Sequence, residues 1–300
     1  MTNVISRDAL CLQAQSKTMT TLLPDDLSCM HFRVARFGRA ARSYESTAHI
    51  QRCLAARLAS RCDVSTPRAI LELGCGTGLL TRRLRERFPD SLLVASDAAP
   101  EMLERACLAV TDEKARFVVQ DASGTGSVHP TIAFHAPYDL VVSGALVQWL
   151  PDLTLHLRFV EALMASRGTY VLSTFTQENF PELRALLTAR SPSHPALPGV
   201  DPIVLDALAR KDGWSLKMLA ESEDQEELPS PRAVLEHLRA MGVSQDPRHA
   251  GRLTRATLNW LLRSYSNRFS TPGGVSLTWR SCIAALEKIR SVGAEATSCG

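Results

Sequence analysis

The sequence predicts an α/β protein whose core is a mostly parallel sheet. Two observations lead to this prediction: short apolar runs alternate with segments of helical spacing, and a glycine-rich turn follows the first apolar run. The chain has 300 residues, of which 45% are hydrophobic and 22% are charged. This composition is typical of globular proteins and suits one large domain, or a core with a lid.

The first strand is expected at residues 68–73, because this apolar run is bounded by Pro67 and Gly74. A helix at residues 46–60 precedes it, and a helix at 79–87 follows it. An alternation of this kind joins parallel strands by crossover helices. The alternation continues with strands at 92–95, 116–119, 139–142 and 169–175 and with helices beginning at Pro100 and at 153–164.

The pattern changes after residue 176. We expect helices at 181–189, 202–210, 231–241 and 253–265, and strands at 214–228 and 274–286. The helices between residues 229 and 268 are additional to a minimal α/β core, so they are candidates for a lid. The predicted organisation is a single domain at 31–290, with its core at 60–228, lid helices at 31–60 and 229–268, and a flexible tail at 291–300.

The first 30 residues are polar and irregular. They lack the basic start and the apolar stretch of a secretory signal. We expect residues 1–30 to be a disordered extension; the alternative is that translation begins at Met19 or Met30.

Composition also excludes several classes of protein. The net charge of +3 is too small to indicate a nucleic-acid binder, and no run approaches 18 apolar residues, so we expect no membrane span. The 8 cysteines include no C-x-x-C pair and no zinc-like cluster with histidines. We therefore expect no metal site, and free thiols in a reducing cytoplasm.

The glycine-rich turn has the form expected of a nucleotide-binding loop. It reads Glu72-Leu73-Gly74-Cys75-Gly76-Thr77-Gly78. In such a loop Gly74 permits the tight turn, Gly76 lets the backbone approach the ligand, and Gly78 lets the helix pack on the strand. Cys75 is small enough for the same turn.

Three acids strengthen this interpretation. Glu72, two residues before Gly74, suits a cationic amino-acid ligand better than a pyrophosphate. Asp97 ends the second strand about 20 residues after the loop, where a carboxylate can accept both ribose hydroxyls. Asp121 follows the third strand, where it can bond an adenine amino group. The set favours S-adenosyl-L-methionine; a nicotinamide dinucleotide usually uses G-x-G-x-x-G, which this loop lacks.

The loop and the acids resemble those of class I methyltransferases. The resemblance implies a Rossmann-like sheet of seven strands, one of them antiparallel, with helical lid insertions. It also implies that the glycines hold the methionine part, Asp97 the ribose, and Asp121 with Ala122 the adenine, while Ser143 and Gly144 end the fourth strand facing the acceptor. The predicted cofactor-binding residues are Glu72, Gly74, Cys75, Gly76, Gly78, Asp97, Ala98, Met102, Asp121, Ala122 and Ser143.

Two acceptor classes are disfavoured. Enzymes that N-methylate nucleic acids often carry [D/N]-P-P-[Y/F] after the fourth strand, where this chain reads Ser143-Gly144-Ala145-Leu146. Arsenic methylation needs a cysteine constellation that is missing.

Motifs outside the glycine loop resemble the malonyl-[acyl-carrier protein] O-methyltransferase family of the biotin pathway. They are residues 36–45 with Gln51, residues 148–150, residues 173–183, residues 234–243 and residues 277–280. The resemblance covers residues 33–290 and implies malonyl-acyl-carrier protein, or malonyl-coenzyme A, as the partner. It implies a substrate side formed by Tyr44, Gln51, Gln148, Trp149, Arg36 and Arg39.

The chain departs from this family at three places. The family usually has Asn at position 144, Pro-Gly-Gly near Arg167-Gly168, and Tyr-His in place of Trp279-Arg280. The first and third departures concern the acceptor side more than the fold.

The implied acceptor is a carboxylate, which is ionised at neutral pH and needs no general base. We therefore expect no catalytic acid–base residue. An acidic carrier implies a basic docking face, and Arg33, Arg36, Arg39 and Arg42 recur at a spacing that aligns them on a helix. Two other functions stay open: a small-molecule methyltransferase of the ubiquinone or trans-aconitate type, and a methyltransferase-like scaffold without catalysis.

Overall fold

The computed structural model describes residues 34–41, 47–190, 199–211, 213–241 and 254–289. The predicted extension at residues 1–30, the tail at 291–300, and Arg33, Arg42 and Tyr44 lie outside the described residues.

One sheet in the order β3-β2-β1-β4-β5-β8-β6 forms the centre of the molecule. The strand β8 is antiparallel to both β5 and β6, and the other strands of this path run parallel, which confirms the predicted seven-stranded sheet with one antiparallel strand. A two-residue strand, β7 (Ser270–Thr271), pairs with β8 in addition. The seven strands are β1 (Ala69–Leu73), β2 (Leu92–Asp97), β3 (Ala115–Val119), β4 (Tyr138–Gly144), β5 (Met164–Phe175), β6 (Trp214–Leu228) and β8 (Gly274–Lys288).

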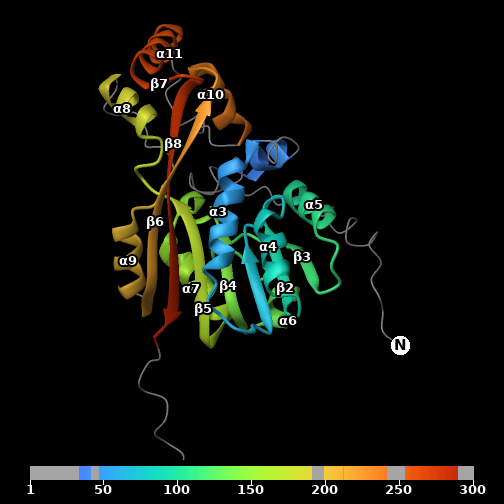
Figure 1. The fold of residues 1–300 in the computed structure, drawn as a ribbon. Helices are drawn as coiled ribbons and strands as arrows, with labels where there is room; N and C mark the ends of the chain where they lie inside the picture. Colours follow the sequence, from blue (N-terminus) through green and yellow to red (C-terminus); the bar gives the residue numbers. More distant parts are fainter. Residues whose placement is uncertain (1–33, 42–46, 191–198, 212, 242–253, 290–300) are drawn as a thin grey trace, which may run out of the picture.

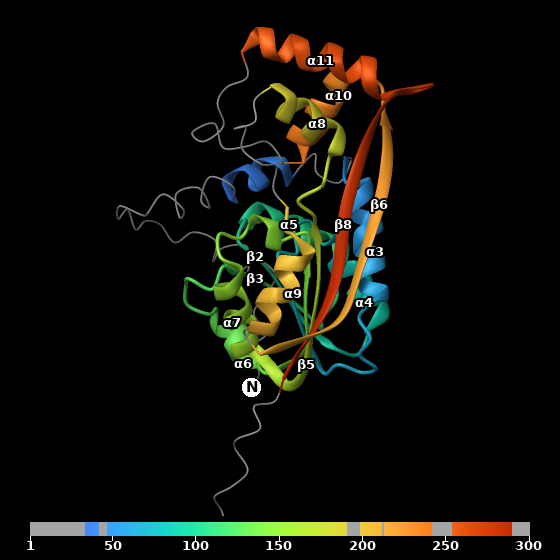
Figure 2. The ribbon, with the colours of Figure 1, turned by 90° about the vertical axis from the view of Figure 1, so that its left-hand side faces the viewer.

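Helices cover both faces of the sheet (Figures 1 and 2). Alternate residues of a strand point to opposite faces. Ile70 accordingly packs in the core on one face of the sheet, while Leu71 packs in the core on the other face. One face carries α3 (His49–Ser60), α4 (Leu79–Arg87) and α5 (Pro100–Ala109), and the other carries α6 (Pro130–His135), α7 (Leu153–Leu163) and α9 (Pro202–Lys211).

The strands β6 and β8 are 15 residues each and extend beyond the parallel strands to a group of helices (Figure 2). This group, which we call the helical cap, consists of α8 (Pro181–Arg190), α10 (Pro231–Ala240) and α11 (Arg255–Phe269). Its buried residues Leu238 and Tyr265 belong to the same core cluster as Phe180 and Trp279. The cap is therefore joined to the body by continuous apolar packing.

Three features differ from the predicted arrangement. Leu54 and Leu58 of α3 are buried in the main core, so this helix belongs to the α/β body and not to a lid. Met164, expected at the end of a helix, begins β5. The short helix α6 and the 3₁₀ turn η1 (Val147–Trp149) were not predicted, because segments of six and three residues are too short to show a helical period.

The parallel strands end at one edge of the sheet. Leu73 pairs with Ser96 on β2 and with Ser143 on β4. The residues that follow these three strand ends therefore meet at the carboxyl edge, the place where open α/β sheets bind ligands. No helix of the described residues is long and apolar enough to cross a membrane.

Candidate functional site

The glycine loop connects β1 to α4 at this edge. Gly74, Gly76 and Gly78 all have positive φ, at 70°, 55° and 87°, a region that side chains other than glycine rarely adopt. A Cβ on Gly74 would also lie 2.9 Å from Cδ1 of Leu146. The loop therefore requires its glycines, as the sequence predicted.

Gly76 and Gly78 have different surroundings. A Cβ on Gly76 would meet nothing within 4 Å, so the backbone there faces open space that a ligand can approach. A Cβ on Gly78 would lie 3.2 Å from Cα of Ala106 on α5. The third glycine thus lets the start of α4 approach another helix, and not the strand that the sequence pattern suggested.

Asp97 ends β2 beside the loop. Its Oδ2 accepts a hydrogen bond from the amide of Gly76 at 2.9 Å, and its Oδ1 accepts one from the amide of Ala99 at 2.8 Å. Burial raises the pKa of Asp97, and these backbone donors oppose that rise. The carboxylate also lines the cavity above the loop, where its remaining lone pairs can accept further hydrogen bonds.

Asp121 and Ala122 follow β3 and line the same cavity with Gln120. Oδ1 of Asp121 accepts a hydrogen bond from the amide of Ser123 at 2.8 Å, which fixes the turn. Together with Asp97, these residues form one end of the cavity. Ala98 and Met102 line it as well.

Glu72 lies beneath the loop with 1% of its surface exposed and does not line the cavity. Neither of its oxygens has a hydrogen-bond partner within the described residues. Burial raises its pKa to about 8; the neighbouring Thr81 hydroxyl opposes this rise, and the charge of Asp97 adds to it. A buried acid without a partner is costly unless a cation or donor compensates it.

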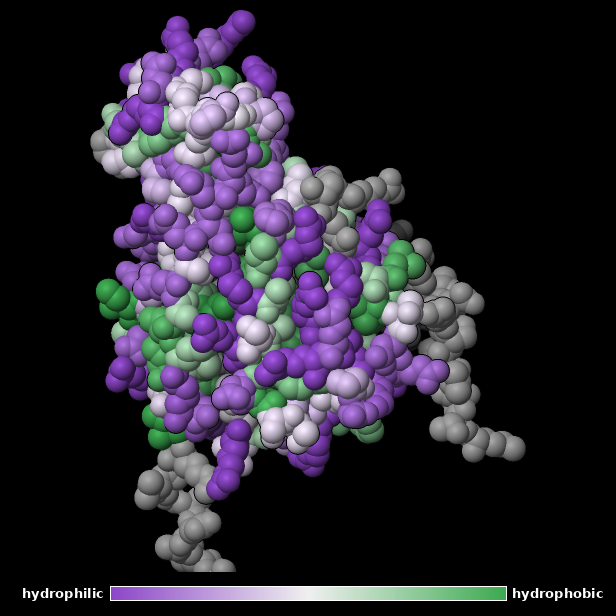
Figure 3. Space-filling view, viewed as in Figure 1, coloured by the Kyte–Doolittle hydropathy of each residue, from purple (hydrophilic) through white to green (hydrophobic). Residues whose placement is uncertain are grey.

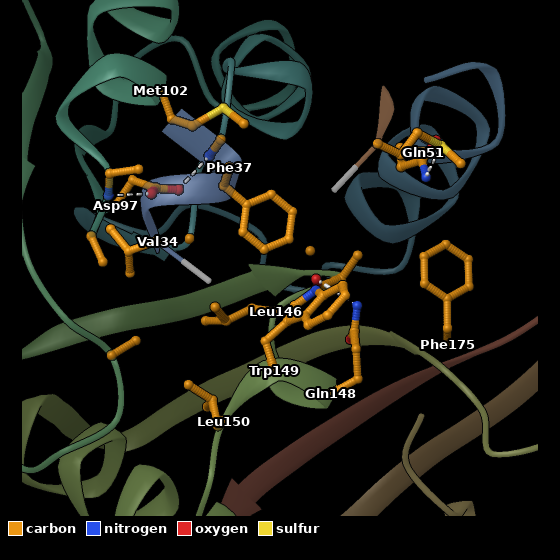
Figure 4. Close-up of a pocket in the computed structure, with 18 of the residues that line it drawn as sticks. Val34, Phe37, Gln51, Asp97, Met102, Leu146, Gln148, Trp149, Leu150 and Phe175 are labelled. Atoms are coloured by element: carbon orange, nitrogen blue, oxygen red, sulfur yellow. Dashed lines mark hydrogen bonds between the residues drawn. The ribbon is translucent and has the colours of Figure 1, made fainter. Parts of the chain in front are cut away.

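The cavity continues from this end past Trp149 to a second end (Figure 4). Figure 4 shows Asp97, Val34 and Met102 at one end and Gln51 and Phe175 at the other. The rings of Phe37 and Trp149 meet edge to face with their centroids 5.1 Å apart. The second end is completed by Asn179, Phe180, Met241 and Trp279.

Amide side chains are held in fixed positions in the second half of the cavity. Gln148 donates from Nε2 to the carbonyl of Ala145 at 2.7 Å and accepts from the Thr174 hydroxyl at 2.8 Å. Asn179 accepts from the amide of Arg280 at 2.9 Å. Gln51 donates to the Met241 sulfur at 3.2 Å, and its Oε1 has no partner within the described residues.

The predicted site residues fall into three groups. Most of them line the cavity: Gly74, Gly76, Asp97, Ala98, Met102, Asp121, Ala122, Gln51, Gln148 and Trp149. Others lie behind its wall or to its side: Glu72, Cys75, Gly78, Ser143, Arg36 and Arg39. Tyr44 lies outside the described residues.

Comparison with known proteins identifies the family. A model described as "Methyltransferase domain" matches residues 71–170, which include the glycine loop, Asp97 and Asp121. The malonyl-[acyl-carrier protein] O-methyltransferase of Porphyromonas gingivalis is 31% identical over 82% of this chain and 91% of its own length. The protein of the same name from Chlorobium phaeovibrioides is also 31% identical, over 84% of this chain and 94% of its own length. The chain belongs to the malonyl-[acyl-carrier protein] O-methyltransferase family.

Solved structures show the same fold as this methyltransferase. The YcgJ protein of Bacillus subtilis superposes with a TM-score of 0.53 at 13% identity, covering 80% of this chain and 99% of its own. Phosphoethanolamine N-methyltransferase 2 of Haemonchus contortus, solved with S-adenosylhomocysteine, gives a TM-score of 0.50 at 14% identity, covering 84% of this chain and 58% of its own. The α/β sheet is thus that of class I methyltransferases.

The methyltransferase also has a buried polar chain that the sequence analysis missed. Nδ1 of His156 lies 2.6 Å from the carbonyl oxygen of Ala122, and Nε2 lies 2.7 Å from the hydroxyl of Tyr170. That hydroxyl lies 2.7 Å from Oγ of Ser143. His156, Tyr170 and Ser143 are all fully buried. This series of hydrogen bonds therefore connects the turn at Ala122 to the end of β4.

The direction of these hydrogen bonds follows from the Ala122 carbonyl, which can only accept. Nδ1 of His156 must donate to it, so Nε2 accepts from Tyr170, whose oxygen in turn accepts from Ser143. Burial lowers the pKa of His156 to about 4, so the ring is neutral at pH 7, as this arrangement requires.

The charged side chains of this methyltransferase's cavity lie at one end. Among its described lining residues the charged ones are Asp97 and Asp121, both at the glycine-loop end. The described residues contain no group of three His, Cys, Asp or Glu side chains that could hold a metal ion. The site is thus suited to a cationic ligand at one end, and at the other to a ligand that contacts aromatic side chains and neutral amides.

Proposed function

We propose that this S-adenosyl-L-methionine-dependent methyltransferase methylates the free carboxylate of a malonyl thioester on acyl-carrier protein, an early step of biotin (pimeloyl) synthesis. The observation that carries the proposal is the neutral acceptor end of the cavity. Its described lining there consists of aromatic and aliphatic side chains and three amides, with no histidine, lysine, cysteine or tyrosine to accept a proton.

An acceptor at this end must be nucleophilic without help. A carboxylate has a pKa near 4 and is ionised at neutral pH, whereas a phenol or an acidic carbon must lose a proton first. The proposed acceptor therefore fits the residues present. The names of the relatives supply the finer identity of the acceptor, a malonyl group carried by a protein.

The glycine-loop end fits S-adenosyl-L-methionine. Asp97 has lone pairs left for ribose hydroxyls after its two backbone bonds, and the backbone at Gly76 is open to a ligand. Glu72 is a buried acid without a partner, beneath the place proposed for the methionine ammonium group. When bound, S-adenosyl-L-methionine supplies an electrophilic methyl group.

The chain's own residues would align the reactants and exclude water. The Phe37–Trp149 pair lies where the two ends of the cavity meet, and Gln148 is held by two hydrogen bonds beside it. Transfer forms one carbon–oxygen bond and breaks one carbon–sulfur bond, with no proton to move. Positioning and desolvation then supply much of the acceleration.

The direct test offers labelled S-adenosyl-L-methionine to the purified protein with malonyl, succinyl or acetyl carrier protein. We expect label and one added methyl mass on the malonyl carrier and none on the acetyl carrier, which lacks a free carboxylate. Label on a small molecule such as aconitate, with none on the carriers, would contradict the proposal.

A further inference from the structure

The helical cap has an unbalanced charge. Its helices expose six arginines and one acid, Glu236. The other acid of these helices, Glu182, is buried and accepts hydrogen bonds from the amide and hydroxyl of Thr278. The exposed arginines of the cap are Arg190, Arg232, Arg239, Arg255, Arg263 and Arg268.

We propose that the helical cap is the surface on which this methyltransferase docks the acidic carrier protein that delivers its acceptor. The inference rests on the proposed function, and it adds the place where the partner binds. Complementary charge steers an acidic partner to a basic face and fixes its orientation there.

The cap lies next to the acceptor end of the cavity, as this role requires. The helix α8 begins directly after Phe180, and α10 is followed by Met241, its C-cap residue. Both residues line the acceptor end. A carrier bound to the cap would therefore hold its thioester arm near the acceptor end and away from the glycine loop.

The cap also has a groove into which a partner can fit. It lies between the start of α10 and α11, and its lining includes Arg232, Leu262, Arg263 and Ser266. Two arginines beside a leucine suit a partner's helix that carries acidic side chains next to an apolar side chain. Hydrophilic side chains lie along the top of the cap in Figure 3.

The neighbouring sheet edge has the opposite charge. The edge strand β6 exposes Glu221, Glu223 and Glu227, and of these Glu223 is paired with Arg280. An acidic carrier is repelled by this edge and attracted by the cap, because like charges raise the free energy of an encounter. The contrast in charge favours the cap over this sheet edge as the docking face.

The test reverses two groove charges in the variant Arg232→Glu/Arg263→Glu. We expect KM for malonyl carrier protein to rise at least about tenfold at low salt, the lower limit of electrostatic steering effects. The affinity for S-adenosylhomocysteine, and kcat/KM with malonyl-coenzyme A, should stay within about twofold. Arg158→Glu/Arg167→Glu is the matched control, since both residues are exposed, on α7 and at the start of β5, away from the cap.

The milder variant Arg232→Gln/Arg263→Gln covers the case in which reversal disturbs folding, and carrier binding is also measured directly by fluorescence anisotropy. Equal loss in the control, equal loss with coenzyme A, or unchanged carrier binding would overturn the docking inference. So would duplex DNA that competes as well as the carrier, because the cap would then be a general polyanion surface. If the wild-type protein binds carrier through the cap but methylates neither thioester, the proposed reaction fails and the docking surface stands.

Discussion

Oδ2 of Asp97 accepts a hydrogen bond from the amide of Gly76 at 2.9 Å, so the acid at the end of β2 fastens the glycine loop at the end of β1. The same carboxylate lines the cavity. One side chain thus connects the shape of the loop with the proposed recognition of the ribose.

The first prediction concerns this residue. Asp97→Ala should weaken S-adenosyl-L-methionine binding by about 1.5–3 kcal/mol, the scale of hydrogen bonds to a charged group. Asp97→Asn keeps one acceptor oxygen and should lose less. Calorimetry on both folded variants measures the difference, and an unchanged affinity for Asp97→Ala would remove this residue from the ribose role.

The second prediction concerns proton release on cofactor binding. The pKa of Glu72 is raised to about 8 by burial, so this acid is mostly protonated in the free protein at pH 7. A bound ammonium favours the ionised form and lowers that pKa. Binding should then release up to one proton at pH 7, and affinity should increase from pH 6 to pH 7.

Titration calorimetry in buffers of different ionisation enthalpy counts the released protons. Glu72→Gln is the control, because its amide cannot ionise; it should bind more weakly and release none of these protons. Equal proton release by the two proteins would show that Glu72 is not the group whose ionisation the bound ammonium group favours.

The third prediction concerns the chemical step. Since the proposed oxygen is already anionic and the described acceptor end has no side chain that accepts a proton, single-turnover rates with saturating cofactor should be nearly constant from pH 6 to 8. Rapid-quench measurements across this range test the expectation. A steep increase centred near pH 7 would indicate a general base and a carbon or phenol acceptor.

The fourth prediction concerns stability in acid. The pKa of His156 is lowered to about 4 by burial, from an ordinary value near 6.5, so the unfolded chain binds a proton in this window before the folded one does. The contribution of His156 is complete above pH 6.5 and is lost as the pH falls toward 4. Its upper limit is of the order of 3 kcal/mol.

Urea unfolding at pH 7 and pH 5 tests whether the free energy of unfolding falls with the pH, as expected. His156→Gln should be less stable at pH 7 and should lose less stability between the two pH values than the wild-type protein. Tyr170→Phe leaves a buried imidazole nitrogen and the Ser143 hydroxyl without their partner, so it should cost about 1–3 kcal/mol at pH 7. If His156→Gln lost as much stability between pH 7 and pH 5 as the wild-type protein, His156 would not be the source of this pH dependence.

The loop and the strand-end acids could be predicted because their constraints are local. Positive φ at Gly74 and Gly76 and the ends of parallel strands follow from short stretches of sequence. Gly74, Gly76, Asp97 and Asp121 line one cavity, while their contacts with the cofactor stay a prediction. Family resemblance also directed attention to the strand with Trp279, which does line the acceptor end.

The acceptor end as a whole could not be assembled from sequence, because it depends on packing between distant segments. Gln51 contacts Met241, which is 190 residues away in the sequence, and Phe37 contacts Trp149 from a helix whose sequence pattern shows only its arginine spacing. His156 lies on the buried face of an ordinary amphipathic helix, where a pattern cannot distinguish a networked histidine from a packed one. These contacts require the folded structure.

The last prediction concerns Arg39, part of the docking face inferred from the helical arginine spacing. This residue is exposed on the helix at 34–41, whose Val34 and Phe37 line the cavity. Arg36 is half-buried and makes contacts of its own. Arg39→Glu therefore changes the surface charge with less effect on packing.

If the carrier extends from the helical cap to this helix, Arg39→Glu should raise KM for malonyl carrier protein about three- to tenfold at low salt, and less at physiological salt, where charges are screened over about 8 Å. Cofactor affinity should be unchanged, because the glycine loop is untouched. Steady-state kinetics with carrier and with malonyl-coenzyme A measure both effects, with Arg158→Glu as the charge control. Loss shared equally by the two thioesters would assign Arg39 a structural role, and no loss would confine the docking surface to the cap.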